Sequence, residues 1–159
     1  MSRQPDFAAM GEGLLIREAR PDDAAAACEL VRSSIVELCG ADHGGDRGRL
    51  AAWLANKTPD NLRAWIVGSH VFLAERDGVL AGVAAVTGEG VITLLYVLPA
   101  QRFTGVSKAL LLALEERARD LGLDLCRLES TATALRFYED CGYRLAEPDR
   151  HSRIMVKPL

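Results

Sequence analysis

The chain has 159 residues, a length that fits one domain with a single hydrophobic core. Apolar residues make up 49% of it and charged residues 26%, which excludes disordered and fibrous proteins. The formal net charge of −3 argues against a large basic surface, so we expect neither nucleic acid nor a membrane surface as a partner.

The four cysteines (Cys28, Cys39, Cys126 and Cys141) form no CxxC pair, and each has apolar neighbours in the sequence. This pattern indicates reduced thiols that pack as small hydrophobic side chains. Residues 1–13 lack the apolar run of a signal peptide, and no later segment has the length of a membrane span. We therefore expect a cytoplasmic protein with a flexible N-terminal tail, residues 1–13, and one domain, residues 14–159.

The first half of that domain is predicted to be mostly helical. In LLIREA (residues 14–19) apolar and charged residues roughly alternate, which is typical of a half-buried strand. Pro21 then begins a predicted helix whose apolar residues recur at spacings of three and four up to Leu38. Gly40 is predicted to end this helix, and the glycines of ADHGGDRG (41–48) predict a loop. Helical patterns follow over 49–57 and 60–67.

The second half alternates strands with helices. HVFLAE (70–75) and VLAGVAAV (79–86) flank Asp77 and Gly78, a typical tight hairpin turn, and residues 91–98 predict a third strand. A helix to about Leu121, with Glu115 and Arg119 four apart, leads to a strand over 123–129 that should lie parallel to 91–98. A short helix over 131–142 and strands over 143–147 and 153–157 complete a mixed α/β layer fold.

The segment VLPAQRFTGVSKALL (97–111) joins a strand to a helix through Gly105. The first NH groups of a helix have no internal partners and lie at the positive end of its dipole, and a glycine there leaves room for an anion. The segment therefore predicts a diphosphate site. It is not a P-loop, because Lys108 lies between Ser107 and Ala109 and not between a glycine and a Ser or Thr, and it lacks the three glycines of a dinucleotide fingerprint.

This segment resembles the acyl-coenzyme A binding motif of the GNAT superfamily of N-acetyltransferases. Arg102, Gly105 and Ser107 take the motif positions after YVLP, although Ser107 replaces the family's Gly or Ala. ATALRFYEDCGYR resembles a later motif of the same family. Its matching residues are Ala134, Phe137, Tyr138, Gly142 and Tyr143, and Thr131 stands where the family frequently has Asn.

The resemblance implies a GNAT-like, mostly antiparallel central sheet of six or seven strands flanked by helices, in which the parallel fourth and fifth strands splay apart. Acetyl-CoA would lie between those strands as the cosubstrate. The residues that this resemblance assigns to cofactor binding are Tyr96, Val97, Arg102, Phe103, Thr104, Gly105, Val106, Ser107 and Thr131.

The resemblance also implies direct attack of an amine on the thioester, with Tyr138 as the general acid. Glu129, at the end of the fifth strand, is our candidate base, since an alkyl amine with a pKa near 10.4 is neutral in only about one molecule in 2,500 at pH 7. Tyr138 is also compatible with simple core packing, and Glu129 with a solvated strand end. No GxSxG motif is present, and Cys141 has no nearby histidine, which argues against a covalent enzyme intermediate.

The resemblance also implies that the first helices and the connection between them form one wall of the site that binds the amine acceptor. This makes Asp42, His43, Trp53 and Lys57 candidate substrate contacts. The spacing of Asp42, His43 and Asp46 fits no metal site, so we expect no metal, and Trp53 also suits a core position. The acceptor is expected to be a small-molecule or peptide amine, and the resemblance is compatible with a homodimer. The alternative function is a non-catalytic acyl-CoA sensor, which would keep Gly105 without needing Tyr138.

Overall fold

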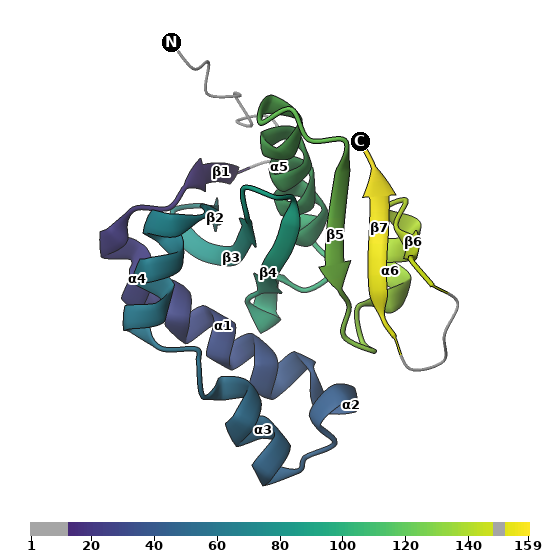
Figure 1. The fold of residues 1–159 in the computed structure, drawn as a ribbon. Helices are drawn as coiled ribbons and strands as arrows, with labels where there is room; N and C mark the ends of the chain where they lie inside the picture. The colour runs from purple at the N-terminus through teal and green to yellow at the C-terminus, as the bar shows by residue number, and fades with distance from the viewer. Residues whose placement is uncertain (1–12, 148–151) are drawn as a thin grey trace.

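The computed structural model describes residues 13–147 and 152–159, so the tail predicted for residues 1–13 lies outside the described residues except for Gly13. A seven-stranded sheet has the order β1-β2-β3-β4-β5-β7-β6, and only β4 and β5 pair in parallel (Figure 1). This confirms the predicted fold class. The strands are β1 (Leu14–Glu18), β2 (His70–Arg76), β3 (Val79–Val86), β4 (Val91–Val97), β5 (Leu125–Glu129), β6 (Arg144–Leu145) and β7 (Ile154–Pro158).

Helices cover both faces of the sheet (Figure 1). Alternate residues of β3 point to opposite faces, so Val83 and Ala85 join one buried cluster while Ala84 and Val86 join the other. The first cluster contains α1 and α4, and the second contains α5 and α6. The helices are α1 (Ala24–Leu38), α2 (Gly40–His43), α3 (Arg47–Leu54), α4 (Pro59–Gly68), α5 (Val106–Asp120) and α6 (Leu135–Asp140), with short 3-10 turns η1 (Pro21–Asp23) and η2 (Pro99–Gln101).

The prediction for residues 40–48 was wrong in part. Gly40 does not simply end α1: the helix ends at Leu38, and Gly40 begins the one-turn helix α2. The left-handed backbone of Gly44 then ends α2, with its NH bonded to the Gly40 carbonyl at 2.8 Å. The side chain of Asp42 on α2 is held by residues about 90 positions later, which no local pattern reveals.

The predicted hairpin is confirmed, because β2 and β3 are joined at Asp77 and Gly78 and both residues have positive φ. The predicted strand over 143–147 is shorter than expected, since β6 contains only Arg144 and Leu145.

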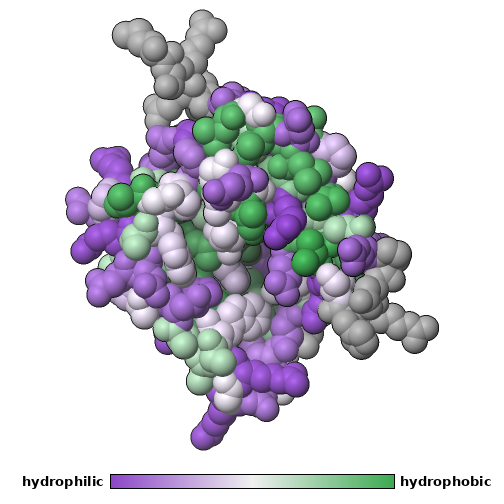
Figure 2. Space-filling view, in the orientation of Figure 1, coloured by the Kyte–Doolittle hydropathy of each residue, from purple (hydrophilic) through white to green (hydrophobic). Residues whose placement is uncertain are grey.

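None of the helices that the structure describes combines the length and the apolar character needed to span a bilayer. Figure 2 shows hydrophobic residues gathered at the upper right of this face, in the region of β5 and β7, where Leu125 is exposed.

A bulge in β4 opens the centre of the sheet. Ala85 of β3 pairs with Leu94 but the next residue, Val86, pairs with Ile92, so Thr93 is left as the extra residue of β4. The parallel pairing between β4 and β5 ends at the same level, with Ile92 opposite Leu128. Beyond this point β4 and β5 diverge, as the resemblance to the GNAT superfamily implied.

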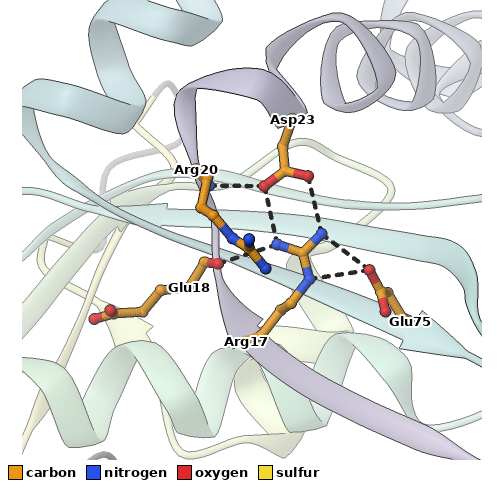
Figure 3. Close-up of polar contacts among 5 residues, drawn as sticks. All are labelled: Arg17, Glu18, Arg20, Asp23 and Glu75. Carbon is orange, nitrogen blue, oxygen red and sulfur yellow. Dashed lines mark hydrogen bonds and ion pairs between the residues drawn. The ribbon is translucent and has the colours of Figure 1, made fainter.

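A charged cluster ties β1 to the start of the first helical segment and to β2 (Figure 3). The Arg17 guanidinium donates two hydrogen bonds of 2.9 Å to the Asp23 carboxylate and a third, of 3.0 Å, to Glu75. Asp23 also accepts a 2.7 Å bond from the Arg20 NH, which caps η1. These bonds lower the pKa of Asp23 to about 2, chiefly through the hydrogen bonds from Arg17.

Candidate functional site

A cavity of about 300 Å³ lies where β4 and β5 diverge. Its walls come from β4, the loop that leads into α5, the end of β5, and α6, with the end of α1 on the remaining side. Of the residues predicted for catalysis and cofactor binding, those that line it are Tyr96, Val97, Arg102, Phe103, Gly105, Val106, Ser107, Glu129, Thr131 and Tyr138. The structure thus brings residues from both sequence motifs into one cavity.

The N-terminus of α5 provides hydrogen-bond donors at the cavity. Gly105 is the N-cap with φ of 85°, and the first intrahelical bond runs from the Ala109 NH to the Gly105 carbonyl at 3.1 Å. The NH groups of residues 106–108 precede that bond, and no side chain of the described residues caps this end of the helix. A Cβ added at Gly105 would meet no atom within 4 Å, so open space faces these donors.

The loop before α5 is braced by its own polar groups. Thr104, the one predicted cofactor contact that does not line the cavity, donates its hydroxyl to the Gln101 carbonyl at 2.6 Å. Its carbonyl accepts a 3.1 Å bond from the guanidinium of Arg76 on β2. These contacts fix the backbone that leads into Gly105, so the donors of α5 are held in place by the protein.

Tyr138 lies on α6 and is 7% exposed. Its ring packs edge-on against Phe137 and Tyr143, with centroid distances of 5.2 and 5.7 Å. Burial raises the pKa of its hydroxyl above the ordinary value of 10, and the nearby Tyr96 raises it further. The hydroxyl is therefore protonated at neutral pH, and Tyr138 is both part of the buried core and one of the residues that line the cavity.

Tyr96 on β4 is the second tyrosine of the cavity. Burial raises the pKa of its hydroxyl to about 12, and a hydrogen bond with the Trp53 side chain acts in the opposite direction. Both cavity tyrosines are consequently neutral at pH 7. Trp53 is half-buried and packs against the α1 side of the core, so it contacts a cavity residue without lining the cavity itself.

Glu129 ends β5 at the cavity and is exposed, whereas Thr131 follows on the connection to α6. The Thr131 hydroxyl accepts a 3.1 Å bond from the Ala134 NH, which fixes the start of α6. Glu129 is thus the carboxylate of the cavity wall and remains open to water, which suits exchange of a proton with solvent.

The four predicted acceptor contacts lie outside the cavity lining. Asp42 accepts hydrogen bonds from the Ala132 NH and from Thr133, and His43 is buried with its Nδ1 accepting a 3.1 Å bond from the Gly45 NH. Lys57 is also largely buried, with its ammonium 2.6 Å from the Asn56 side chain. Within 13–147 and 152–159, no three potential metal ligands cluster.

The end of α1 supplies cavity residues that the sequence analysis did not identify: Ser34, Leu38 and Cys39. Ser34 is only 3% exposed, and a serine within an otherwise apolar helical stripe is the signal that could have identified it. Burial raises the pKa of Cys39 to about 11, and the nearby Asp42 adds to this effect. The thiol is thus neutral at pH 7 and is a poor nucleophile.

Comparisons with known proteins agree with this geometry. A family model described as an acetyltransferase (GNAT) domain matches residues 42–154, more than half of the chain. A GCN5-related N-acetyltransferase structure from Rhodopseudomonas palustris is 25% identical with a TM-score of 0.84, and the alignment covers 95% of this chain and 98% of that one. No curated protein sequence matches the chain.

Two further solved structures share the fold and contain the cofactor. The PaiA N-acetyltransferase of Thermoplasma acidophilum, in complex with coenzyme A, is 21% identical with a TM-score of 0.79, covering 92% of this chain and 99% of that one. YncA of Salmonella typhimurium, a putative acetyltransferase with acetyl-CoA, is 23% identical with a TM-score of 0.67, covering 92% and 94%.

Proposed function

Because the chain belongs to the GNAT acetyltransferase family, we propose that it transfers the acetyl group of acetyl-CoA directly to a primary amine. The observation that carries this proposal is a single cavity lined by Gly105 at the start of α5, by Glu129 and by Tyr138. Anion-binding donors, a solvent-open carboxylate and a protonated hydroxyl are the groups that this reaction needs. The complexes of PaiA with coenzyme A and of YncA with acetyl-CoA support the choice of cosubstrate.

The residues present fit the cosubstrate. The NH groups of residues 106–108 and the open space at Gly105 suit a diphosphate, since each hydrogen bond to a charged group contributes about 1.5 to 3 kcal/mol. Tyr96 and Val97 on the diverging part of β4 would then lie beside the pantetheine arm. Bound in this way, acetyl-CoA supplies an activated acyl group with a thiolate as leaving group.

The proton transfers can be assigned to two residues. As the amine nitrogen bonds to the carbonyl carbon, Glu129 accepts the proton that the nitrogen loses, directly or through water. As the carbon–sulfur bond breaks, the Tyr138 hydroxyl donates a proton to the sulfur, and solvent restores it. The raised pKa of Tyr138 is compatible with this role, because the same apolar surroundings also destabilise the leaving thiolate.

The test is thiol release from acetyl-CoA with a panel of primary amines, comparing wild type, Tyr138→Phe and Tyr96→Phe. Tyr96→Phe is the matched control, because it removes a second buried hydroxyl from the same cavity. We expect Tyr138→Phe to lower kcat about 100-fold while the affinity for CoA is kept, and Tyr96→Phe to lower kcat much less.

Three outcomes would contradict the proposal. If CoA binds but no amine releases thiol above background, the domain acts as a non-catalytic acyl-CoA sensor. Equal losses in the two tyrosine variants would remove the assignment of Tyr138 as the acid. Failure of the wild-type protein to bind CoA would remove the cosubstrate itself.

A further inference from the structure

Phe103 is an aromatic side chain that the fold leaves in water. It is 91% exposed, and among the described residues it is the only aromatic one in the set of exposed large hydrophobic side chains. Its close neighbour Val106 is 1% exposed, so the chain buries apolar groups at this point of the loop but not the Phe103 ring. Phe103 is nevertheless one of the residues that line the cavity, which places this exposed residue at the cavity mouth.

The backbone conformation of Phe103 is strained. Phe103 has φ of 63°, in the left-handed region that a bulky side chain rarely adopts. In the part of the chain that the structure describes, the other non-glycine residue with positive φ is Asp77 in the hairpin turn. The bonds from Thr104 to Gln101 and from Arg76 to Thr104 brace the conformation. A strained, exposed aromatic residue at a cavity is a reason to look for a ligand.

The surroundings of the ring match one kind of ligand. The Arg102 guanidinium lies 4.6 Å from the centroid of the Phe103 ring, and the free NH groups at the start of α5 follow three residues later. A planar apolar surface beside a cation and a set of anion donors is suited to a nucleotide, whose base and phosphates are separated by a single ribose.

We propose that the Phe103 ring stacks on the adenine base of the acyl-CoA cosubstrate and so favours the whole cofactor over forms that lack the nucleotide. This rests on the proposed function, since it needs the diphosphate at the start of α5. The chemistry recognised is a purine ring, because stacking on an aromatic face requires no particular hydrogen-bonding edge.

The experiment measures, by calorimetry, the binding of CoA and of 4′-phosphopantetheine, which keeps the pantetheine arm but has no adenine. Phe103→Asn removes the ring and suits a left-handed backbone, whereas Phe103→Tyr keeps the ring. We expect Phe103→Asn to weaken CoA binding about tenfold, a loss typical of one stacked base, and to leave 4′-phosphopantetheine binding unchanged. Phe103→Tyr should bind both ligands as the wild type does.

Several results would overturn the stacking proposal while leaving acetyl transfer intact. The first is an equally large loss of binding for both ligands in Phe103→Asn, which would indicate a changed loop. The second is unchanged binding of both ligands in Phe103→Asn. The third is weakened CoA binding in Phe103→Tyr as well. If Phe103→Asn instead alters only self-association in sedimentation, the ring belongs to an interface between copies of the chain. If wild-type protein binds neither ligand, the proposed function fails together with the stacking.

Discussion

The Asp42 carboxylate accepts a 2.5 Å hydrogen bond from the hydroxyl of Thr133, a residue 91 positions later in the chain. It also accepts a bond from the Ala132 NH and lies 3.5 Å from the guanidinium of Arg153. Asp42 belongs to α2, and Thr133 lines the cavity on the connection between β5 and α6. The Asp42 carboxylate therefore links α2 to the part of the cavity wall that lies between β5 and α6.

Replacing Asp42 by Ala should loosen this connection. Because the NH groups of Ala132 and Thr133 lose their acceptor, we expect their amide hydrogen exchange to become at least tenfold faster, and the KM for the amine to rise. Asp46→Ala is the control, since Asp46 caps α3 through the Arg49 NH. It should accelerate exchange only in α3. Unchanged exchange at residues 132 and 133 in Asp42→Ala would disprove the connection.

Gly105 can be tested against a glycine at the other end of the same helix. Gly105 and Gly122 have φ of 85° and 78°, and a Cβ at either position meets no atom within 4 Å. Alanine at each site should therefore lower the free energy of unfolding by a similar amount, about 1 kcal/mol. Only Gly105→Ala should raise the KM for acetyl-CoA, about fivefold or more, because its methyl group enters the space before the α5 donors.

Steady-state kinetics with varied acetyl-CoA, together with urea unfolding, separates the two effects. If Gly122→Ala raised the KM as much as Gly105→Ala, the change would reflect a distorted helix. If neither variant changed the KM, the space in front of Gly105 would not hold the cosubstrate.

Local signals in the sequence were sufficient for much of the fold. The Asp77–Gly78 turn requires positive φ at both residues, which fixes the hairpin between β2 and β3 with no help from the rest of the molecule. That the segments around Gly105 and Tyr138 belong to one site was implied by their resemblance to two motifs of one family, and both segments line one cavity.

Features that depend on distant partners were not predictable. The bulge at Thr93 exists only relative to the pairing with β3, and the position of Asp42 depends on Thr133. Glu115 and Arg119 are opposite charges four residues apart on α5, a spacing at which two side chains can pair. Instead Glu115 is 1% exposed and faces β7, while Arg119 is exposed. A helical period shows which residues share a face, but not which charged residue is turned inward.

Glu115 is a buried carboxylate with two partners. It lies 3.0 Å from the ammonium of Lys157 on β7 and accepts a 2.8 Å hydrogen bond from the Tyr143 hydroxyl. Glu115→Ala leaves both partners without their acceptor, so we expect the free energy of unfolding to fall by about 3 kcal/mol. Glu116→Ala, a half-buried neighbour with no ion pair within the described residues, should change it by less than about 1 kcal/mol. Equal values in urea unfolding would disprove the role of Glu115.

Asp23 should make the stability of the protein depend on pH. Its folded-state pKa of about 2 lies below the ordinary value of 3.8, so the folded state favours the ionised carboxylate. The stabilisation is complete above about pH 5 and is lost as the pH falls from 4 towards 2. The shift corresponds to about 2 kcal/mol, and partial exposure of both Arg17 and Asp23 reduces our expectation to about 1 kcal/mol.

The measurement is the free energy of unfolding of wild type, Asp23→Asn and Asp22→Asn from pH 7 down to pH 2.5. Asp23→Asn should be less stable than wild type at pH 7, and the difference should shrink below pH 4 because the unfolded wild-type carboxyl then takes up a proton that the folded carboxyl does not bind. Asp22 is exposed on the same turn, so its amide variant should follow the wild-type curve. A difference for Asp23→Asn that stays constant across this range would show that its carboxylate charge contributes nothing, and that the hydrogen bonds to Arg17 and Arg20 act through geometry alone.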